Sequence, residues 1–355
     1  MTLTYHDQYS SSFIVKKAFP QLLLLVFIGI LSACSPTIQQ YSGFKNSAKM
    51  TDEHFISSDG VKLRLQSWLP VGEPSAVLLG LHGFNDHSGA FTELGPRLAA
   101  LGFAVYAYDQ RGFGTSERRG IWADTPTLIS DFLEVSTLIK SRHSIISLNA
   151  LGESMGGAVL LAAHDKTHSE RVGHIDGIIL SAPAIGGSKT KSKWQMKLLS
   201  FLAHTLPMVR LQADGLNIKA SDNTEMLRAL GDDPKFIRKT RIDAIYGLLG
   251  LMDVALDAAK NLTKPVLILY GANDELILKE HTCEMIRKLP KGSWRLAFYP
   301  NGYHLLFRDL GRDLVTNDIV SWLQKPVNQL PSGFEQHYTE TNAEEKFFCS
   351  NMISD

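Results

Sequence analysis

A serine set among glycines is the residue in this sequence best suited to nucleophilic chemistry. The run Gly152-Glu153-Ser154-Met155-Gly156-Gly157 follows an apolar stretch and opens a stretch with helical spacing. This is the context of the G-x-S-x-G elbow, a sharp strand-to-helix turn that exposes the serine hydroxyl. Glycines are needed there because side chains would collide with the neighbouring helix and strand. The pattern predicts that Ser154 attacks a carbonyl carbon.

A serine hydroxyl needs a general base, and the base needs a carboxylate that fixes its tautomer. In folds with this elbow the chain order is serine, acid, histidine. Three histidines follow the apolar stretch 265–270: His281, His304 and His337. His281 falls within an expected helix and His337 in a polar tail, whereas His304 stands in a loop directly after the stretch 294–299. We therefore expect His304 to be the base.

The acid is expected at the carboxyl end of the strand before His304. The run Gly271-Ala272-Asn273-Asp274 places Asp274 there, and Glu275 is the nearest competitor. Glu275 begins the run toward the next helix, so Asp274 is the better candidate. A capping role is the alternative for Asp274, because Asp is a common helix N-cap. We expect Asp274 to orient His304.

Acyl transfer creates an oxyanion, which backbone N–H groups fixed beside it can stabilise. The first donor is expected to be the N–H of Met155, the residue after the nucleophile. The second is expected from His82-Gly83-Phe84, the loop after the third strand, where Gly83 lets the chain turn so that the Phe84 N–H faces the pocket. The sequence thus predicts an oxyanion hole made by Phe84 and Met155.

Polar residues near these loops also have structural interpretations. His82 is a second candidate base, but at this place its ring is expected to support the loop from behind. Asp109 and Arg111, in the loop 109–116 after another apolar run, could pair with each other. We expect this loop to have an architectural role.

Short, uniformly apolar runs predict strands buried on both faces of a parallel sheet, at 76–81, 103–108, 145–151 and 175–180. The runs 265–270 and 294–299 continue the series, and 61–69 alternates like a half-exposed edge strand that pairs with the segment near Phe55. Segments with helical spacing are 91–101, 128–140, 156–164, 280–289 and 314–323. Strands that alternate with helices imply right-handed βαβ units. The sequence therefore predicts an α/β fold with a mostly parallel central sheet flanked by helices.

The alternation breaks at residues 187–256, which show helical patterns but no convincing strand. We interpret this interval as a helical cap inserted after the sixth strand. The expected division is a signal peptide at 1–34, a linker at 35–50, a core at 51–186 and 257–325, the cap at 187–256 and a polar C-terminal tail at 326–355.

The expected cap carries an apolar stripe, spaced as on a helix, at residues 194–211. Lys189, Lys191 and Lys193 directly precede it. Such stripes usually pack onto a core, but one beside basic residues can also face lipid. The sequence leaves both interpretations open.

The N-terminus has the order of a secretory signal peptide: Lys16-Lys17, an apolar run at 22–31, and then Ser32-Ala33-Cys34. The run is well short of the roughly 20 residues that span a bilayer. Small residues before a cysteine resemble the lipobox of bacterial lipoproteins, whose cysteine is acylated. The alternative is an exported protein with a chance cysteine. An acylated Cys34 implies a protein anchored to a membrane on the periplasmic side.

Composition argues against other classes of function. Lys and Arg balance Asp and Glu at 36 each, so no net field favours nucleic acid. His164 and His168 lack the glutamate of a zinc-protease helix and lie far from the expected pocket, so we expect neither a metal nor another cofactor. A disulfide between Cys283 and Cys349 can form, but nothing in the sequence indicates it.

With these residues identified, residues 53–323 resemble the monoacylglycerol lipase and lysophospholipase branch of the α/β-hydrolases. The resemblance rests on His82-Gly83-Phe84-Asn85-Asp86-His87-Ser88-Gly89, the 109–116 loop, the run from Gly152 to Gly157, Gly271-Ala272-Asn273-Asp274 and Gly302-Tyr303-His304. It implies an α/β-hydrolase fold, a Ser154, Asp274 and His304 triad, and a cap that selects the substrate. Two residues depart from the family pattern: Glu153, where many relatives have histidine, and Phe84, where alanine is common.

The expected function is hydrolysis of a carboxylic ester of a single-chain lipid, through an acyl-enzyme on Ser154. The same fold also serves general carboxylesterases, thioesterases and peptidases. A non-catalytic lipid-binding protein that kept the fold is the alternative from another class. Such proteins usually lose a triad member, and this chain has all three.

Overall fold

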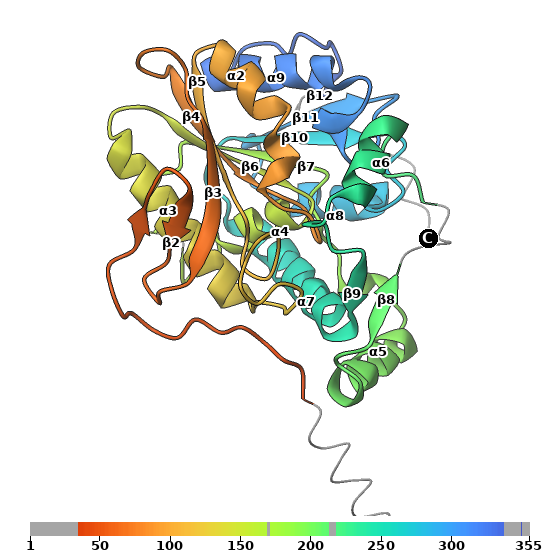
Figure 1. Cartoon of the computed structure of the whole chain (residues 1–355). Coiled ribbons are helices and arrows are strands. Elements are labelled where there is room, and N and C mark those ends of the chain that lie inside the picture. Colours follow the sequence, from red (N-terminus) through yellow and green to blue (C-terminus); the bar gives the residue numbers. More distant parts are fainter. Residues whose placement is uncertain (1–34, 169–170, 213–217, 337–348, 350–355) are drawn as a thin grey trace, which may run out of the picture.

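The computed structural model describes residues 35–168, 171–212, 218–336 and 349 of the chain (Figure 1). The expected signal peptide at 1–34, with Cys34, lies outside these residues, as do His337 and most of the expected tail. A central sheet lies between two layers of helices, with α5, α6 and the short strands β8 and β9 to one side (Figure 1).

The main sheet has ten strands in the described residues, in the order β1-β2-β3-β5-β4-β6-β7-β10-β11-β12. Neighbouring strands pair in parallel from β5 to β11, while the strands at both edges pair antiparallel. The strands are β1 (Lys49–Met50), β2 (His54–Ile56), β3 (Lys62–Trp68), β4 (Ala76–Leu81), β5 (Phe103–Tyr108), β6 (Leu148–Glu153), β7 (Gly177–Ser181), β10 (Val266–Gly271), β11 (Trp294–Tyr299) and β12 (Glu335–Gln336). The predicted mostly parallel sheet is confirmed.

Helices cover both faces of this sheet. Alternate residues of β4 point to opposite faces, so Leu79 joins a core cluster with α3, α4, α7 and α8, while Leu78 joins one with α2 and α9. The helices are η1 (Ser88–Phe91), α2 (Leu94–Ala100), α3 (Thr125–Arg142), α4 (Met155–Ala162), α8 (Lys279–Lys288), η4 (Leu306–Arg308) and α9 (Arg312–Gln324). The helix α3 begins after Asp124, whose side chain accepts a hydrogen bond from the Thr127 N–H.

The strand before Ser154 begins later than its apolar pattern predicts. Residues 145–151 were the expected strand, but β6 is Leu148–Glu153 and Ile145 is 86% exposed. Pairing with β4 sets the start of β6, because Leu148 lies opposite Val77. The strand therefore runs to Glu153 and ends directly at Ser154.

The expected cap segment follows β7, the seventh strand, because the two-residue β1 precedes the expected hairpin. The segment also contains a two-stranded sheet that the sequence did not indicate, since strands of three residues are too short to show a period. Its last helix packs on the core, where Leu251, Ala255 and Leu256 belong to the same cluster as α4. The elements are η2 (Ser188–Thr190), α5 (Lys193–Thr205), β8 (Arg210–Gln212), α6 (Thr224–Asp232), β9 (Lys239–Arg241), α7 (Ile242–Ala258) and η3 (Ala259–Asn261).

The helix α5 exposes part of its apolar stripe. A capping box of Ser192 and Gln195 starts the helix, and Ala203 is its one buried residue. Trp194 is 69% and Phe201 60% exposed. Both interpretations of this stripe therefore hold in part: Met196, Leu199 and Leu202 are half-buried, because α5 packs on α7, whereas Trp194, Leu198 and Phe201 meet solvent.

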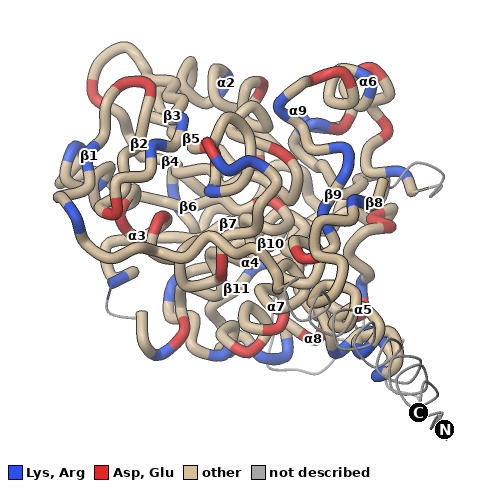
Figure 2. Tube along the Cα trace, turned by 60° about the horizontal axis from the view of Figure 1, so that its bottom comes forward, with Lys and Arg blue, Asp and Glu red and all other residues tan. Residues whose placement is uncertain are grey.

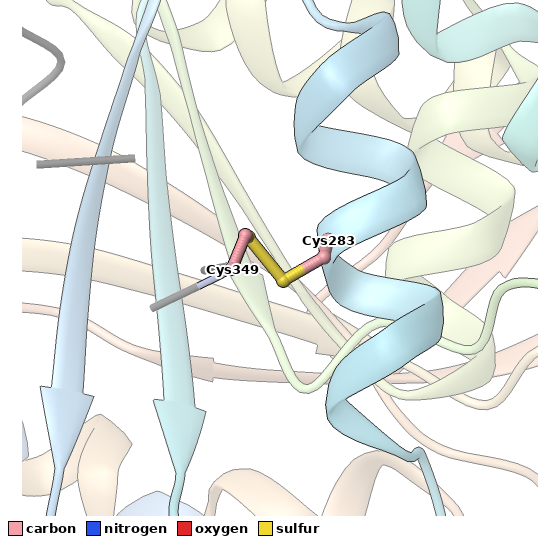
Figure 3. The surroundings of a disulfide bond; sticks show 2 residues. All are labelled: Cys283 and Cys349. Atoms are coloured by element: carbon pink, nitrogen blue, oxygen red, sulfur yellow. A yellow bond between two sulfur atoms is a disulfide. The ribbon is translucent and has the colours of Figure 1, made fainter. Parts of the chain in front are cut away.

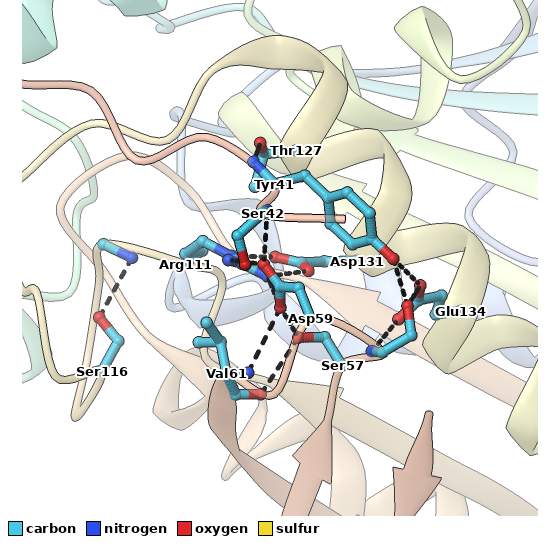
Figure 4. A network of polar contacts seen from close by, with 12 residues as sticks. Tyr41, Ser42, Ser57, Asp59, Val61, Arg111, Ser116, Thr127, Asp131 and Glu134 are labelled. Atoms are coloured by element: carbon cyan, nitrogen blue, oxygen red, sulfur yellow. Dashed lines mark hydrogen bonds and ion pairs between the residues drawn. The ribbon is translucent and has the colours of Figure 1, made fainter. Parts of the chain in front are cut away.

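Arg111 holds the loop after β5 through a buried ion cluster (Figure 4). Its guanidinium pairs with Asp59 in the turn between β2 and β3, at 2.8 Å, and with Asp131 of α3, at 2.7 Å. The predicted pairing of Arg111 with Asp109 is wrong, because Asp109 instead accepts hydrogen bonds from Ser88 and Thr115. The architectural role expected for the loop agrees with these contacts.

Residues 35–41, which we call the N-terminal strap, lie along the core, although they fall in the expected linker. The Gln39 N–H donates to the Trp122 carbonyl at 2.8 Å, and the Gln39 side chain donates to the Ile121 carbonyl at 2.6 Å. The Thr37 N–H donates to Asp243, the second residue of α7, at 3.2 Å. The strap therefore joins the loop before α3 to the first turn of α7.

A disulfide joins Cys283 of α8 to Cys349 (Figure 3). Both cysteines are buried, so the bond ties a residue of the expected tail to the helical layer of the core. The sequence did not indicate this pair, because the two residues are 66 positions apart and Cys349 has no periodic pattern around it.

The charged residues are spread over the fold, with Lys and Arg positions interspersed among Asp and Glu positions (Figure 2). Over the described ranges, none of the helices has the length and apolarity to cross a bilayer.

Candidate active site

Ser154 lies at the junction of β6 and α4 in a backbone conformation that L residues rarely adopt. Its φ is 51° and its ψ is −114°. The Ser154 N–H donates to the Ser181 carbonyl at 2.9 Å, and the Ser154 carbonyl accepts from the Ala184 N–H at 2.9 Å. These bonds from the end of β7 hold the strained turn, which is the elbow that the sequence predicts.

Glycines beside Ser154 allow the helix to approach the sheet. A Cβ added to Gly152 would lie 2.4 Å from the Gly157 nitrogen, and one added to Gly156 would lie 2.2 Å from the Leu81 carbonyl oxygen. Both contacts involve backbone atoms, which cannot move without shifting a strand or the helix. The elbow therefore requires glycine at these two positions.

The loops after β10 and β11 bring Asp274 and His304 together. The His304 Nδ1–H donates to the Asp274 Oδ2 at 2.8 Å, and both side chains are buried. The other oxygen of Asp274 accepts from the backbone N–H groups of Leu276 and Ile277, at 2.8 and 2.9 Å. Because the carboxylate can only accept, Nδ1 carries the proton and Nε2 is the basic nitrogen of the ring.

The loops that carry Asp274 and His304 touch through their glycines. A Cβ added to Gly271 would lie 2.4 Å from the Tyr303 carbonyl oxygen, and the Asn273 N–H donates to the Gly302 carbonyl at 2.9 Å. Glu275, the competing acid, instead accepts from the Lys219 N–H at 2.8 Å and is exposed. The geometry thus pairs His304 with Asp274 and leaves Glu275 outside the pair.

The loop after β4 lies against the elbow. A Cβ added to Gly83 would lie 3.5 Å from the Ser154 Cβ. Met155 is the first residue of α4, so its N–H has no acceptor within the helix. Of the two predicted oxyanion donors, Met155 directly follows Ser154 in the chain, and Phe84 follows Gly83, whose backbone lies against Ser154.

His82 supports this loop, as expected. It is fully buried, its Nδ1 donates to the Gly83 carbonyl at 2.8 Å, and its Nε2 accepts from the Gln110 N–H at 2.9 Å. Burial lowers the pKa of His82, so the ring is neutral at pH 7. Both ring nitrogens are engaged, which leaves neither for proton transfer.

Phe84 builds an apolar wall where the resemblance implies a smaller residue. Its ring lies edge-on to Phe113 and Trp122, with centroids 5.6 and 6.1 Å apart. Trp122 in turn lines a cavity of about 1040 Å³ between the N-terminal strap, α5 and α7. Phe84, Ser154 and His304 do not line this cavity.

One group of residues at the site was missed from the sequence. Arg308 lies within 2.6 Å of Glu153 and 2.8 Å of Asp86, and all three are buried; we call them the Arg308 cluster. The one signal in the sequence is an arginine that follows the apolar run Leu305-Leu306-Phe307. Only the fold shows which carboxylates it meets.

Comparison with protein families gives a match over most of this core. The Hydrolase_4 family model, described as serine aminopeptidase, S33, matches residues 72–311. That range contains Ser154, Asp274 and His304.

Two curated relatives align over nearly their whole length. The chain is 27% identical over 283 residues to the monoacylglycerol lipase of Mycolicibacterium smegmatis, which covers 78% of this chain and 98% of that protein. It is also 27% identical over 280 residues to the monoglyceride lipase of Homo sapiens, which covers 78% of this chain and 90% of that protein.

Solved structures share the fold. A soluble variant of the monoglyceride lipase from Saccharomyces cerevisiae, in complex with a substrate analogue, superposes with a TM-score of 0.66 at 23% identity, covering 81% of this chain and 100% of that chain. The monoacylglycerol lipase of Paleococcus ferrophilus gives a TM-score of 0.61 at 24% identity, covering 74% of this chain and 98% of that chain. The predicted α/β-hydrolase fold is confirmed.

Asp274→Asn tests the role of the Asp274 carboxylate. An amide in its place can donate to Nδ1, which favours the wrong tautomer of His304, so kcat should fall by about 10⁴-fold. The measurement is the turnover of p-nitrophenyl butyrate at pH 7.5. The matched control is Glu275→Gln, which should keep the kcat of the unmodified enzyme. Equal losses in the two variants would show that Asp274 does not have this role.

Proposed function

The chain belongs to the serine aminopeptidase S33 family of α/β-hydrolases, and we propose that it is a serine hydrolase that cleaves the ester bond of a monoacylglycerol. The observation that carries the proposal is the 2.8 Å hydrogen bond between His304 and Asp274, on loops that follow β10 and β11 at the carboxyl edge of the sheet. Ser154 stands at the same edge, at the end of β6.

In the proposed mechanism, Ser154 Oγ attacks the ester carbonyl carbon while His304 Nε2 takes the hydroxyl proton. The resulting imidazolium is stabilised by Asp274. His304 then gives the proton to the glycerol oxygen, which leaves, and an acyl group remains on Ser154. Water then attacks the acyl-enzyme while His304 Nε2 takes its proton, and His304 returns that proton to Ser154 Oγ as the fatty acid leaves.

The oxyanion of each tetrahedral intermediate accepts hydrogen bonds from the backbone N–H groups of Phe84 and Met155. Each such donor is typically worth about 10² to 10³ in kcat. Met155 also lies at the N-terminus of α4, where the helix dipole favours negative charge. The strained elbow keeps the Met155 N–H beside the Ser154 hydroxyl, and the loop of Phe84 lies against it through Gly83.

The relatives named monoacylglycerol and monoglyceride lipases support an acylglycerol as the substrate. The apolar rings of Phe84, Phe113 and Trp122 support an acyl chain beside the oxyanion loop. A lysophospholipid carries the same acyl ester with a phosphate head group, so the two substrates differ in the group that leaves.

Substrate profiling with a Ser154→Ala control tests the proposal. We expect the highest kcat/KM for monoacylglycerols in a panel with lysophospholipids, short p-nitrophenyl esters, an acyl thioester and a peptide anilide, with products identified by mass spectrometry. Ser154→Ala should fold normally and lose at least about 10⁴-fold in kcat on every ester. Lipase activity in that variant would refute the mechanism, and a preference for the thioester or anilide would refute the substrate class.

We also propose that the protein is exported and anchored to a membrane through an acylated Cys34. The disulfide between Cys283 and Cys349 supports an oxidising compartment, because such bonds persist in periplasmic and secreted proteins. The N-terminal strap supports an anchor close to the cap. Pro36, two residues after Cys34, lines the same cavity as Met196 and Phe201 of α5.

The exposed face of α5 supports contact with the membrane surface on this side. Trp194, Leu198 and Phe201 are exposed on the helix, beside exposed Lys193 and Lys197. Large apolar side chains next to lysines suit the boundary between acyl chains and anionic head groups. An anchor at Cys34 would hold this face toward the lipid that carries the substrate.

Two variants test the membrane proposal. Cys34→Ser should lose incorporation of radioactive palmitate in the bacterial host and move to the soluble fraction. Trp194→Ser with Phe201→Ser should keep the anchor and the turnover of soluble p-nitrophenyl butyrate, but lower the turnover of monoacylglycerol in vesicles by about tenfold, through the loss of buried apolar area. Palmitate on the Cys34→Ser protein would contradict the anchor at Cys34. Unchanged turnover of monoacylglycerol in vesicles by the Trp194 and Phe201 double variant would contradict the contact of α5 with the membrane.

A further inference from the structure

The Arg308 cluster is a buried group of charges that the proposed mechanism does not use. Arg308 donates to the Glu153 Oε2 at 2.6 Å and lies 2.8 Å from the Asp86 Oδ2. Glu153 is fully buried, and Asp86 and Arg308 are 3% and 5% exposed. Burial of three charges is costly unless they are paired, so the pairing is required for this arrangement.

Each member of the cluster lies next to a different part of the site. Glu153 directly precedes Ser154, and Asp86 is two residues after Phe84. Arg308 ends η4, four residues after His304. A single guanidinium therefore joins the elbow, the oxyanion loop and the loop of the base.

Further bonds make these connections rigid. The second oxygen of Asp86 accepts from the His87 N–H at 2.8 Å, and the Asp86 N–H donates to the Gly83 carbonyl at 3.3 Å. The Arg308 carbonyl accepts from the Asn223 side chain, just before α6, at 3.0 Å. The cluster thus also connects the three loops to the start of α6.

Within the cluster one cation, Arg308, serves two carboxylates. Burial raises the pKa of Glu153, and Arg308 opposes this shift. Burial also disfavours the charged form of Arg308, but Glu153 and Asp86 raise its pKa above the usual value. Without Arg308, two carboxylates would share a buried space with no cation between them, and the loops would move apart.

We propose that Arg308 is a positioning residue: through Asp86 and Glu153 it fixes the Phe84 N–H, the Ser154 hydroxyl and the His304 ring relative to one another. This inference rests on the proposed acyl transfer, and it adds a determinant of its geometry. Arg308 touches neither Ser154 nor the substrate's ester in this role. It acts by holding the three loops at separations that suit the tetrahedral intermediate.

The protein contains a matched control for this proposal. Arg111 is also buried and also pairs with two carboxylates, Asp59 and Asp131, but these join the turn before β3 to α3 (Figure 4). Loss of either cluster should lower the melting temperature. The loop of Arg111 touches the oxyanion loop only through Gln110 and Phe113, so loss of its cluster should change kcat far less than loss of the Arg308 cluster.

The test compares Arg308→Lys, Glu153→Gln and Arg111→Lys in the full chain with p-nitrophenyl butyrate, with the folded fraction measured by circular dichroism. Lysine keeps the charge of Arg308 but cannot bridge two carboxylates with a planar fork. A shift of about 1 Å in the catalytic groups can cost about 100-fold in rate, so Arg308→Lys should lower kcat by about that factor, with KM within about twofold of the unmodified enzyme. Glu153→Gln keeps the size of the side chain and should lower kcat about tenfold, again at unchanged KM.

The control Arg111→Lys should lower the kcat per folded molecule far less than Arg308→Lys does. Unchanged kcat in Glu153→Gln and in folded Arg308→Lys would overturn the proposal, as would an equal loss of kcat in Arg111→Lys. If Arg308→Lys does not fold, Glu153→Gln decides the question by the same criterion. Failure of the proposed function can be told apart from failure of the Arg308 proposal, because the unmodified enzyme would then hydrolyse none of the esters.

Discussion

The strained backbone at Ser154 is the constraint on which the rest of the site depends. A left-handed φ at a non-glycine residue persists only when its surroundings hold it, and here the end of β7 does so through hydrogen bonds to the Ser154 N–H and carbonyl. At this turn the chain passes from Glu153, the last residue of the buried strand β6, to Met155, the first residue of α4. This places a hydroxyl and a helix N-terminus at the same point, and the glycines at 152 and 156 let α4 lie against β6 and β4.

The parallel sheet explains why residues so far apart in the chain can act together. The strands β4, β6, β10 and β11 run in one direction, so the loops that follow them meet at the same edge. These loops carry Phe84, Ser154, Asp274 and His304. Contacts between loops then set the fine geometry: the hydrogen bond of Asp274 with His304, the close approach of Gly271 to the Tyr303 carbonyl, and the ion pairs of Arg308.

The sequence predicted the parts of the fold that follow from local pattern. Uniformly apolar runs predicted β4 and β5 at their observed bounds, because strands buried on both faces leave no polar position, and the largely apolar run 294–299 predicted β11. The start of β6 was misplaced, since its limit is set by pairing with β4. Long-range pairs were not predictable: Cys283 with Cys349, Arg111 with Asp59 and Asp131, and Arg308 with Asp86 and Glu153. In each case the partners lie on elements that only the folded chain brings together. The candidate site, in contrast, could be predicted because its motifs follow strands in a fixed order.

The central claim is that Ser154, activated by His304 and Asp274, is the nucleophile. Its most direct test is to react the native protein with a fluorophosphonate probe and to locate the adduct by peptide mass spectrometry. The account predicts one phosphonyl group, on Ser154, in the native protein and none after heat denaturation, because the hydroxyl reacts only when the folded loops activate it. An adduct on a different residue, or no adduct in a preparation that hydrolyses esters, would contradict it.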